Sequence, residues 1–360
     1  MAARGSAGAP AGAPSTAAPQ AGGGGEADRT LSPWLARQAD RLLRQRGHAW
    51  LLQGPSGLGQ YRLALELVRA WLCDRPTPAA CGSCGSCHAI DVRTHADLHV
   101  LMPETAMLQL GWPLGEKAQS EVDDKKRKPS REIRVDAMRE ATEFAQRTDA
   151  RGRGKAVLVY PAEQMNAIAA NALLKTLEEP TGAVRFVLAS EAAHQLLPTI
   201  RSRCQVHTLE WPQADEMAGW LDGQGVPPAE AEAFLRMAGG RPEDALALAR
   251  SGRSPAAWSR LPRALAQGDG SGLAGWPADE VVESLQKLCH DLMARAADAP
   301  PRYFAAADLP SRLPGASTLA AWSAELRQAA RTASHPFHAG LMLDALVARA
   351  RNVLNSPASR

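Results

Sequence analysis

The sequence lacks long apolar runs, since no stretch approaches the roughly eighteen residues that a transmembrane helix needs. It also lacks the charged start and apolar core of a signal peptide. There is little excess of one charge, because 41 Lys and Arg residues face 38 Asp and Glu residues. These absences exclude a membrane protein and argue against a dedicated nucleic-acid-binding protein. We expect a soluble, cytoplasmic protein.

The length of 360 residues and the hydrophobic content of 45% allow two or three domains with filled cores. Residues 1–30 are mainly Ala, Gly, Pro and Ser, which predicts a disordered tail. Strand and helix patterns alternate over residues 31–211 and predict an α/β domain with a parallel sheet covered on both faces. Residues 212–250 predict a small helical domain. Residues 251–360 predict a linker with some helix at 251–277, followed by a third, all-α domain.

Apolar runs and helical periodicity locate the individual elements of the α/β domain. Residues 104–131 lack these patterns, and their glycines, prolines and charges predict an inserted loop outside the core. The expected strands are residues 49–52, 98–102, 156–160, 186–189 and 205–209, and the expected helices are residues 33–43, 58–72, 133–147 and 166–179. Further helices are expected at residues 281–297, 319–332 and 337–354.

Residues 54–61 have the outline of a phosphate-binding loop between a strand and a helix. Gly54 and Gly59 stand at the glycine positions of the pattern G-x-x-x-x-G-K-[ST]. A working loop adds a Lys for the terminal phosphates and a hydroxyl for Mg²⁺, whereas this chain has Gln60 and Tyr61. The sequence therefore predicts the scaffold of an ATP site without bound ATP.

A second part of an ATPase site is also absent. A motor ATPase would place Asp-Glu after the strand at residues 156–160, the Asp for Mg²⁺ and the Glu to activate water. This chain has Tyr160 and Pro161 there, and neither can bind Mg²⁺ or act as a base at neutral pH. Glu163 follows as either a displaced base or a solvated loop carboxylate, and the second interpretation is favoured.

Four of the six cysteines, Cys73, Cys81, Cys84 and Cys87, lie within a short segment. Two C-x-x-C spacings let neighbouring thiolates bind one ion, and four thiolates indicate a closed, structural zinc site. The alternative is a set of unliganded or redox thiols. His88 is adjacent but is not needed as a ligand. The isolated, apolar-flanked Cys204 and Cys289 are expected in the core.

Residues 171–180 predict an amphipathic helix that ends at Pro180, and Arg201 and Arg203 follow near the edge of a strand. By composition alone the two arginines would be surface charge. Together, this helix, the triplet at residues 202–204, the cysteine module and the glycine loop resemble the AAA+ clamp-loader subunits of bacterial DNA polymerase III. The resemblance covers about residues 31–250, and the remaining helices fit the family's collar domain in type and length.

The resemblance implies an AAA+ type P-loop domain with a zinc module at residues 73–87, a helical lid domain and a C-terminal collar domain that mediates oligomerisation. The family's motor subunits, gamma and tau, keep the loop Lys-Thr and the Asp-Glu pair. The delta-prime branch does not, and this sequence matches that branch. The expected partners are delta and gamma/tau subunits, with the sliding clamp and primer-template DNA reached through the complex.

The resemblance also implies a role for Arg203 as an arginine finger that enters the ATP site of a neighbouring motor subunit. A guanidinium there stabilises the charge of the transferred phosphoryl group, an effect of about 10³ to 10⁵ in rate. Arg201 would be a bystander. Glu243 stands where the motor subunits carry a second-domain arginine, which agrees with lost nucleotide sensing, although Arg241 could substitute.

Two other functions remain open from the sequence. The first is an active ATPase with a divergent loop. The second is a zinc-containing DNA-binding protein whose basic run at residues 125–128 contacts phosphates. Glu121, Asp123 and Asp124 precede that run, so a solvated, disordered insertion is the favoured interpretation of the segment.

Overall fold

The computed structural model describes residues 31–75, 79–180, 182–333 and 339–357, and the expected tail at residues 1–30 lies outside them. A parallel five-stranded sheet with the order β2-β3-β4-β1-β5 organises the first half of the described chain. The strands are β1 (Ala49–Gln53), β2 (Leu98–Leu101), β3 (Lys155–Val159), β4 (Val184–Ser190) and β5 (Gln205–Thr208). The expected α/β fold class is therefore confirmed.

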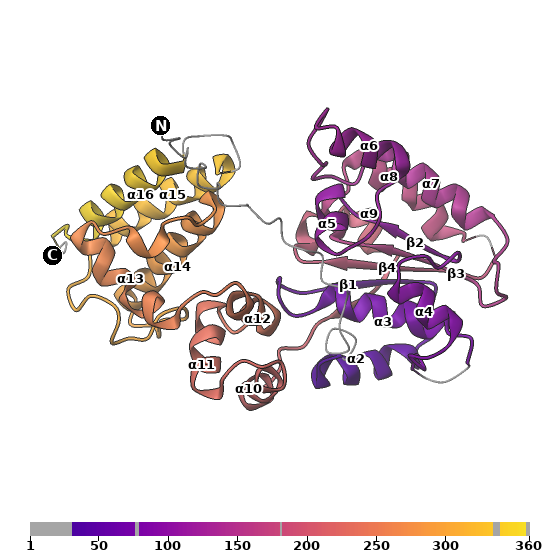
Figure 1. Cartoon of the computed structure of the whole chain (residues 1–360), viewed down its shortest axis with the longest axis horizontal. Helices are drawn as coiled ribbons and strands as arrows, with labels where there is room; N and C mark the ends of the chain where they lie inside the picture. Colours follow the sequence, from indigo (N-terminus) through magenta and orange to yellow (C-terminus); the bar gives the residue numbers. More distant parts are fainter. Residues whose placement is uncertain (1–30, 76–78, 181, 334–338, 358–360) are drawn as a thin grey trace, which may run out of the picture.

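Helices cover both faces of the sheet (Figure 1). One face carries α2 (Pro33–Leu43), α3 (Gln60–Leu72) and α4 (Gly85–Asp91), and the other carries α7 (Val135–Gln146) and α8 (Ala167–Glu178). Because side chains alternate along a strand, Trp50 and Leu52 join the core of the first face, while Leu51 joins that of the second. The short elements nearby are η1 (Ala162–Gln164), η2 (Ala193–Gln195) and α9 (Pro198–Arg201).

The expected inserted loop at residues 104–131 contains two helices, α5 (Glu104–Gln109) and α6 (Glu116–Asp123). Trp112 is only 7% exposed and packs in the core of the first face. Arg127, from the basic run, bonds Glu104 and places its Nε 2.7 Å from Glu121. The prediction of a disordered loop outside the core is thus corrected, because two helices, an apolar anchor and internal ion pairs order the segment, whereas Lys125, Lys126 and Lys128 are exposed as expected.

The rest of the described chain is helical. The helices after the sheet lie in two groups, one closer to the sheet and one farther from it (Figure 1). They are α10 (Ala214–Gly223), α11 (Pro228–Met237), α12 (Pro242–Arg250), α13 (Pro255–Gln267), α14 (Ala278–Ala296), α15 (Ala316–Thr332) and α16 (Ala339–Leu354), with the short η3 (Ser271–Leu273). The expected linker therefore contains a full helix, α13, whose buried Trp258 stacks on Phe304 with ring centroids 4.6 Å apart.

A buried carboxylate holds the loop between α14 and α15, and this loop contacts the turn after α11. Asp291, on α14, is fully buried and accepts hydrogen bonds from the backbone N–H groups of Arg302, Tyr303 and Phe304 at 2.7 to 2.9 Å. The Arg302 guanidinium then donates to the carbonyl of Gly239, after α11, at 2.7 Å. Among the described residues, no helix combines the length and apolar character needed to cross a membrane.

We expect Asp291→Ala to lower the free energy of unfolding by about 3 kcal/mol, because three N–H donors lose a buried, charged acceptor. Urea unfolding followed by circular dichroism measures this change. The matched control is Asp222→Ala, at an exposed position of α10, which should change stability by less than about 0.5 kcal/mol. Equal effects of the two substitutions would contradict the anchoring role of Asp291.

Candidate functional site

The glycine loop at residues 54–61 joins the carboxyl end of β1 to the N-terminus of α3. Gly57 and Gly59 have φ angles of 75° and 97°, in the left-handed region that favours glycine. Gly59 is the N-cap of α3, so the unpaired N–H groups of the first helical turn lie beside the loop. The backbone therefore has the features of a phosphate-binding loop.

Gln60 stabilises this loop by donating hydrogen bonds to the loop's carbonyl groups. Its side chain is directed inward, and the residue is only 2% exposed. The Nε2 atom donates to the carbonyl oxygens of Gly54 at 2.7 Å and Pro55 at 2.6 Å. An amide carries no charge, so Gln60 stabilises the loop without offering a cation to phosphate.

An aromatic pair stands where the hydroxyl and the Asp-Glu pair of an ATPase would be. The rings of Tyr61 and Tyr160 lie 5.3 Å apart. The hydroxyl of Tyr61 accepts a hydrogen bond from Trp112 Nε1 at 2.7 Å, and the hydroxyl of Tyr160 donates to Glu191 Oε1 at 2.7 Å. Burial, followed by the nearby Glu191 charge, raises the pKa of Tyr160. Both hydroxyls are therefore engaged inside the protein.

The N-terminus of α12 lies directly on the glycine loop. The backbone N–H of Glu243 donates to the carbonyl of Gly57 at 3.1 Å. A Cβ atom at Gly57 would lie 2.5 Å from the carboxylate of Asp244, and one at Gly59 would lie 2.9 Å from Glu243 Oε1. Two carboxylates of α12 therefore lie against the glycine loop.

Both carboxylates are partly buried, and each lies beside an arginine. Burial raises the pKa of Asp244 and of Glu191. Arg62 lies 3.6 Å from Glu243, and the Nε of Arg241 lies 2.6 Å from Asp244. Arg241, considered above as a substitute nucleotide sensor, is thus paired with a carboxylate of its own helix.

Glu163 is not the solvated loop carboxylate that the sequence favours. Its Oε2 accepts a hydrogen bond from the Ser190 hydroxyl at 2.7 Å, and its Oε1 accepts one from the backbone N–H of Glu191 at 3.1 Å. These contacts join the turn after β3 to the end of β4. Glu163 therefore stabilises the carboxyl edge of the sheet.

The four clustered cysteines meet at one point between α3 and α4. All four Sγ atoms lie within 4.8 Å of one another, and Cys73 Sγ is 3.7 Å from Cys84 Sγ and 3.9 Å from Cys87 Sγ. A tetrahedral ion with metal–sulfur bonds of about 2.3 Å would separate its sulfur ligands by roughly 3.8 Å. Backbone N–H groups also approach Cys73 and Cys84, at 3.5 and 3.4 Å. The donor set can therefore hold one metal ion.

Polar contacts connect this cysteine cluster to the sheet. Asp74 accepts hydrogen bonds from both the hydroxyl and the backbone N–H of Ser86, which lower the pKa of Asp74 to about 2. Ser86 also lies 3.1 Å from His95 Nε2. The ring of His95 accepts from the backbone N–H of Asp97, just before β2. The segment that leads into β2 therefore also positions the cysteine cluster.

Arg203 lies at the amino edge of the sheet, two residues before β5. Its guanidinium contacts Glu178, the last residue of α8, and donates through Nη1 to the carbonyl of Thr199 at 2.8 Å. Arg201 is exposed. Cys204 is partly buried in the core of the second sheet face, where burial raises its pKa to about 12, and Cys289 is 2% exposed.

The strand register separates Arg203 from the glycine loop of its own chain. Trp50, near the start of β1, pairs with Gln205, and Gln53, at its end, pairs with Thr208. The loop follows Gln53, whereas Arg203 precedes Gln205. The paired segment alone spans roughly 10 Å along the strand direction. The two groups therefore belong to opposite edges of one sheet.

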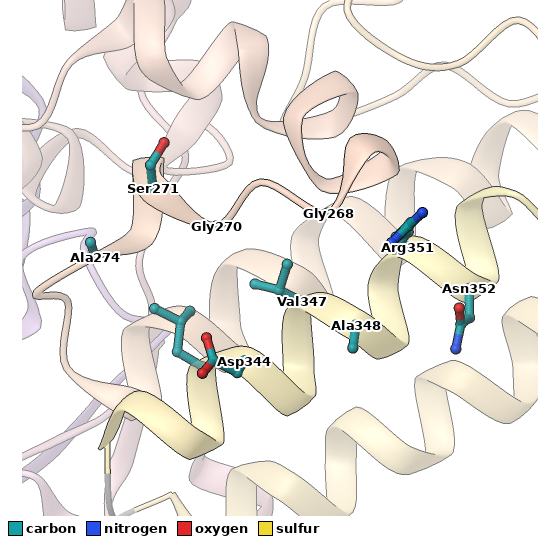
Figure 2. A pocket seen from close by; sticks show the side chains of 10 residues that line it. Gly268, Gly270, Ser271, Ala274, Asp344, Val347, Ala348, Arg351 and Asn352 are labelled. Atoms are coloured by element: carbon teal, nitrogen blue, oxygen red, sulfur yellow. The ribbon is translucent and has the colours of Figure 1, made fainter.

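A surface hollow of about 410 Å³ lies between α16 and the turn after α13, away from the glycine loop and Arg203 (Figure 2). Val347 and Arg351 approach this turn closely. A Cβ atom at Gly270 would lie 2.7 Å from Val347, and one at Gly268 would lie 3.1 Å from Arg351. The close packing of turn and helix accounts for these two glycines.

Several residues of the site could not be found by sequence reasoning. Glu178 and Glu191 carry no motif that marks them, and they meet Arg203 and Tyr160 only in the folded chain. The position of Asp244 on the glycine loop likewise depends on how α12 packs. The cysteine module, by contrast, was evident from its spacing and is brought together as expected.

Comparison with known proteins gives consistent matches. A family model described as DNA polymerase III, delta subunit, matches residues 36–213. DNA polymerase III subunit delta' of Pseudomonas aeruginosa is 41% identical over 267 residues, which cover 73% of this chain and 69% of the relative. The Escherichia coli subunit delta' is 35% identical over 60% of each chain. A tau subunit of Salmonella typhimurium is 31% identical over 44% of this chain and 21% of its own. The matches thus span about 60 to 70% of the subunit delta' relatives named here.

The double substitution Gln60→Lys and Tyr61→Thr returns the missing side-chain types to the loop. We expect the variant to bind ATP with a Kd of about 1 mM or weaker, because Glu243 and Asp244 still repel phosphate. Titration with a fluorescent ATP analogue and Mg²⁺ measures this affinity. A variant that also carries Glu243→Gln and Asp244→Asn should bind more tightly. Micromolar binding by the double variant would contradict the role of the two carboxylates.

Proposed function

Because this chain belongs to the DNA polymerase III subunit delta' family, we propose that it is the non-hydrolysing subunit of a clamp loader and lends Arg203 to a neighbouring ATPase subunit. In this role the protein is a scaffold of the complex that loads the sliding clamp on primed DNA. The observation that carries the proposal is the separation of Arg203 from its own degenerate glycine loop across the sheet. A guanidinium at that edge is available to a neighbour's site and not to its own.

The catalytic contribution would be electrostatic. A guanidinium beside the γ-phosphate offsets the charge that develops on the transferred phosphoryl group and donates hydrogen bonds to its oxygens. Arginine suits this task because its planar group stays charged and presents several donors. Arg203 would supply that group in trans, while the neighbouring subunit holds ATP and Mg²⁺.

We further propose that the chain has no ATPase activity of its own. Gln60 offers no charge to phosphate, Tyr61 offers no hydroxyl to Mg²⁺ in the position of a Ser or Thr, and Tyr160 replaces the acidic pair. Glu243 and Asp244 add negative charge beside the loop. These contacts support a loop retained for structure, and they argue against the alternative of an active ATPase with a divergent loop.

The alternative of a zinc-containing DNA-binding protein receives less support. Within the basic run, Arg127 is bound by Glu104 and Glu121, and Lys126 lies 2.7 Å from Asp124. These carboxylates offset much of the charge that phosphate contacts would need. Contact with primer-template DNA and the sliding clamp is therefore proposed through the complex with delta and gamma/tau subunits. We place this complex in the cytoplasm.

We propose structural zinc for the four-cysteine site. Cys73, Cys81, Cys84 and Cys87 supply only thiolates, which suit a closed tetrahedral zinc site. Hydrogen bonding, led by the backbone of Ser83, lowers the pKa of Cys81 to about 6, which favours its thiolate form at neutral pH. The ion would connect the end of α3 to α4 and so hold that side of the α/β domain.

We expect Arg203→Ala to slow ATP hydrolysis at the neighbouring site by about 10³-fold without preventing assembly. Single-turnover hydrolysis by the reconstituted complex, with clamp and primed DNA, measures the change in rate. Gel filtration shows whether the complex still assembles. Arg201→Ala removes an exposed arginine two residues away and is the matched control. Unchanged hydrolysis in Arg203→Ala would eliminate the finger role.

Replacing a proposed zinc ligand tests the metal site. Cys84→Ser should reduce bound zinc from about one ion per chain to almost none and should destabilise the protein by roughly 3 kcal/mol or more, because metal binding contributes to folding. Elemental analysis and urea unfolding measure the two effects. Cys204→Ser, outside the cluster, should retain the metal. The proposal would be refuted if the parent protein contained no metal and the Cys84→Ser protein had the same stability as the parent.

A further inference from the structure

Glu178 contacts the guanidinium of Arg203 on its Nε and Nη2 side. Arg203 Nε lies 2.5 Å from Glu178 Oε1, and Nη2 bonds the same oxygen. Nη1 donates to the carbonyl of Thr199 at 2.8 Å. The contact joins α8 to the turn after α9, two helices that lie side by side (Figure 1). Three nitrogen atoms of one side chain are therefore fixed by two residues of the same chain.

This arrangement leaves part of the guanidinium available. A guanidinium has five N–H groups, and the three contacts use three of them, so two remain on Nη1 and Nη2. The Arg203 side chain is 31% exposed and that of Glu178 is 46% exposed. The charged group therefore reaches the surface while its direction is set from within the chain.

We propose that Glu178 is a positioning residue for Arg203, which orients the guanidinium for a phosphate of the neighbouring subunit. This inference rests on the proposed function of Arg203. A long arginine side chain has many rotamers, and one held in advance loses less freedom when it meets phosphate. Donors that are already directed at the developing charge also need no rearrangement during the reaction.

Whether removal of the Glu178 carboxylate slows or speeds ATP hydrolysis distinguishes a positioning role from an inhibitory one. If Glu178 only masked Arg203, removing the carboxylate would free the finger and speed hydrolysis. If Glu178 positions Arg203, removing the carboxylate slows hydrolysis, because the guanidinium spends less time in the productive direction. Thr199 would still accept one hydrogen bond, so the loss is smaller than that of Arg203 itself.

The test compares Glu178→Gln with Glu179→Gln in the reconstituted complex. Glu179 is also exposed and adjacent, so its substitution removes the same charge. We expect Glu178→Gln to lower the single-turnover rate at the neighbouring site about threefold to tenfold, with little change in the ATP concentration at half-maximal rate. Glu178→Asp should retain part of the rate, and Glu179→Gln should match the parent.

A double-mutant cycle with Arg203→Ala separates the two proposals. Glu178→Gln should have no further effect in the Arg203→Ala background, because it acts through that arginine. A full effect there, an equal effect of Glu179→Gln, or faster hydrolysis in Glu178→Gln would overturn the positioning role. An Arg203→Ala complex that hydrolyses ATP at the parent rate would instead overturn the finger role. Equal melting temperatures of all variants verify that folding is unchanged.

Discussion

The parallel register of β1 with β4 and β5 is the constraint on which the other features depend. It places every strand's carboxyl end on one edge of the sheet, where the glycine loop, Tyr160 and Glu191 meet. The amino ends lie on the opposite edge, together with Arg203. Because helices return the chain between parallel strands, the C-terminus of α8 also reaches that edge and brings Glu178 to Arg203.

At the carboxyl edge, internal contacts surround the glycine loop. The positive φ angles of Gly57 and Gly59 keep the loop's shape, but Gln60 bonds its carbonyls and α12 covers it with carboxylates. These contacts hold α12 against the sheet domain. Such a connection suits a subunit whose proposed role is to present a fixed surface to a neighbour.

The cysteine cluster and Asp291 stabilise the chain at two other places by similar means. In each, buried or clustered polar groups find several partners: four sulfur atoms around one point, and three N–H groups around one carboxylate. Removing one partner would leave the others unsatisfied, which is more costly than the loss of a surface contact. Both sites fix the connection between two successive helices, α3 and α4 at the cysteines and α14 and α15 at Asp291.

The sequence by itself determined the α/β class, the degenerate loop, the cysteine module and the likeness to clamp-loader subunits, because local spacing and periodicity encode these features. It misjudged residues 104–131, where Trp112 becomes buried against distant elements, and it did not show that the expected linker with some helix packs into the core through Trp258. Only the tertiary structure decided that Glu243 and Asp244 lie on the glycine loop and that Glu178 holds Arg203. These contacts join residues far apart in the chain, so they depend on how helices pack against the sheet and not on any local pattern.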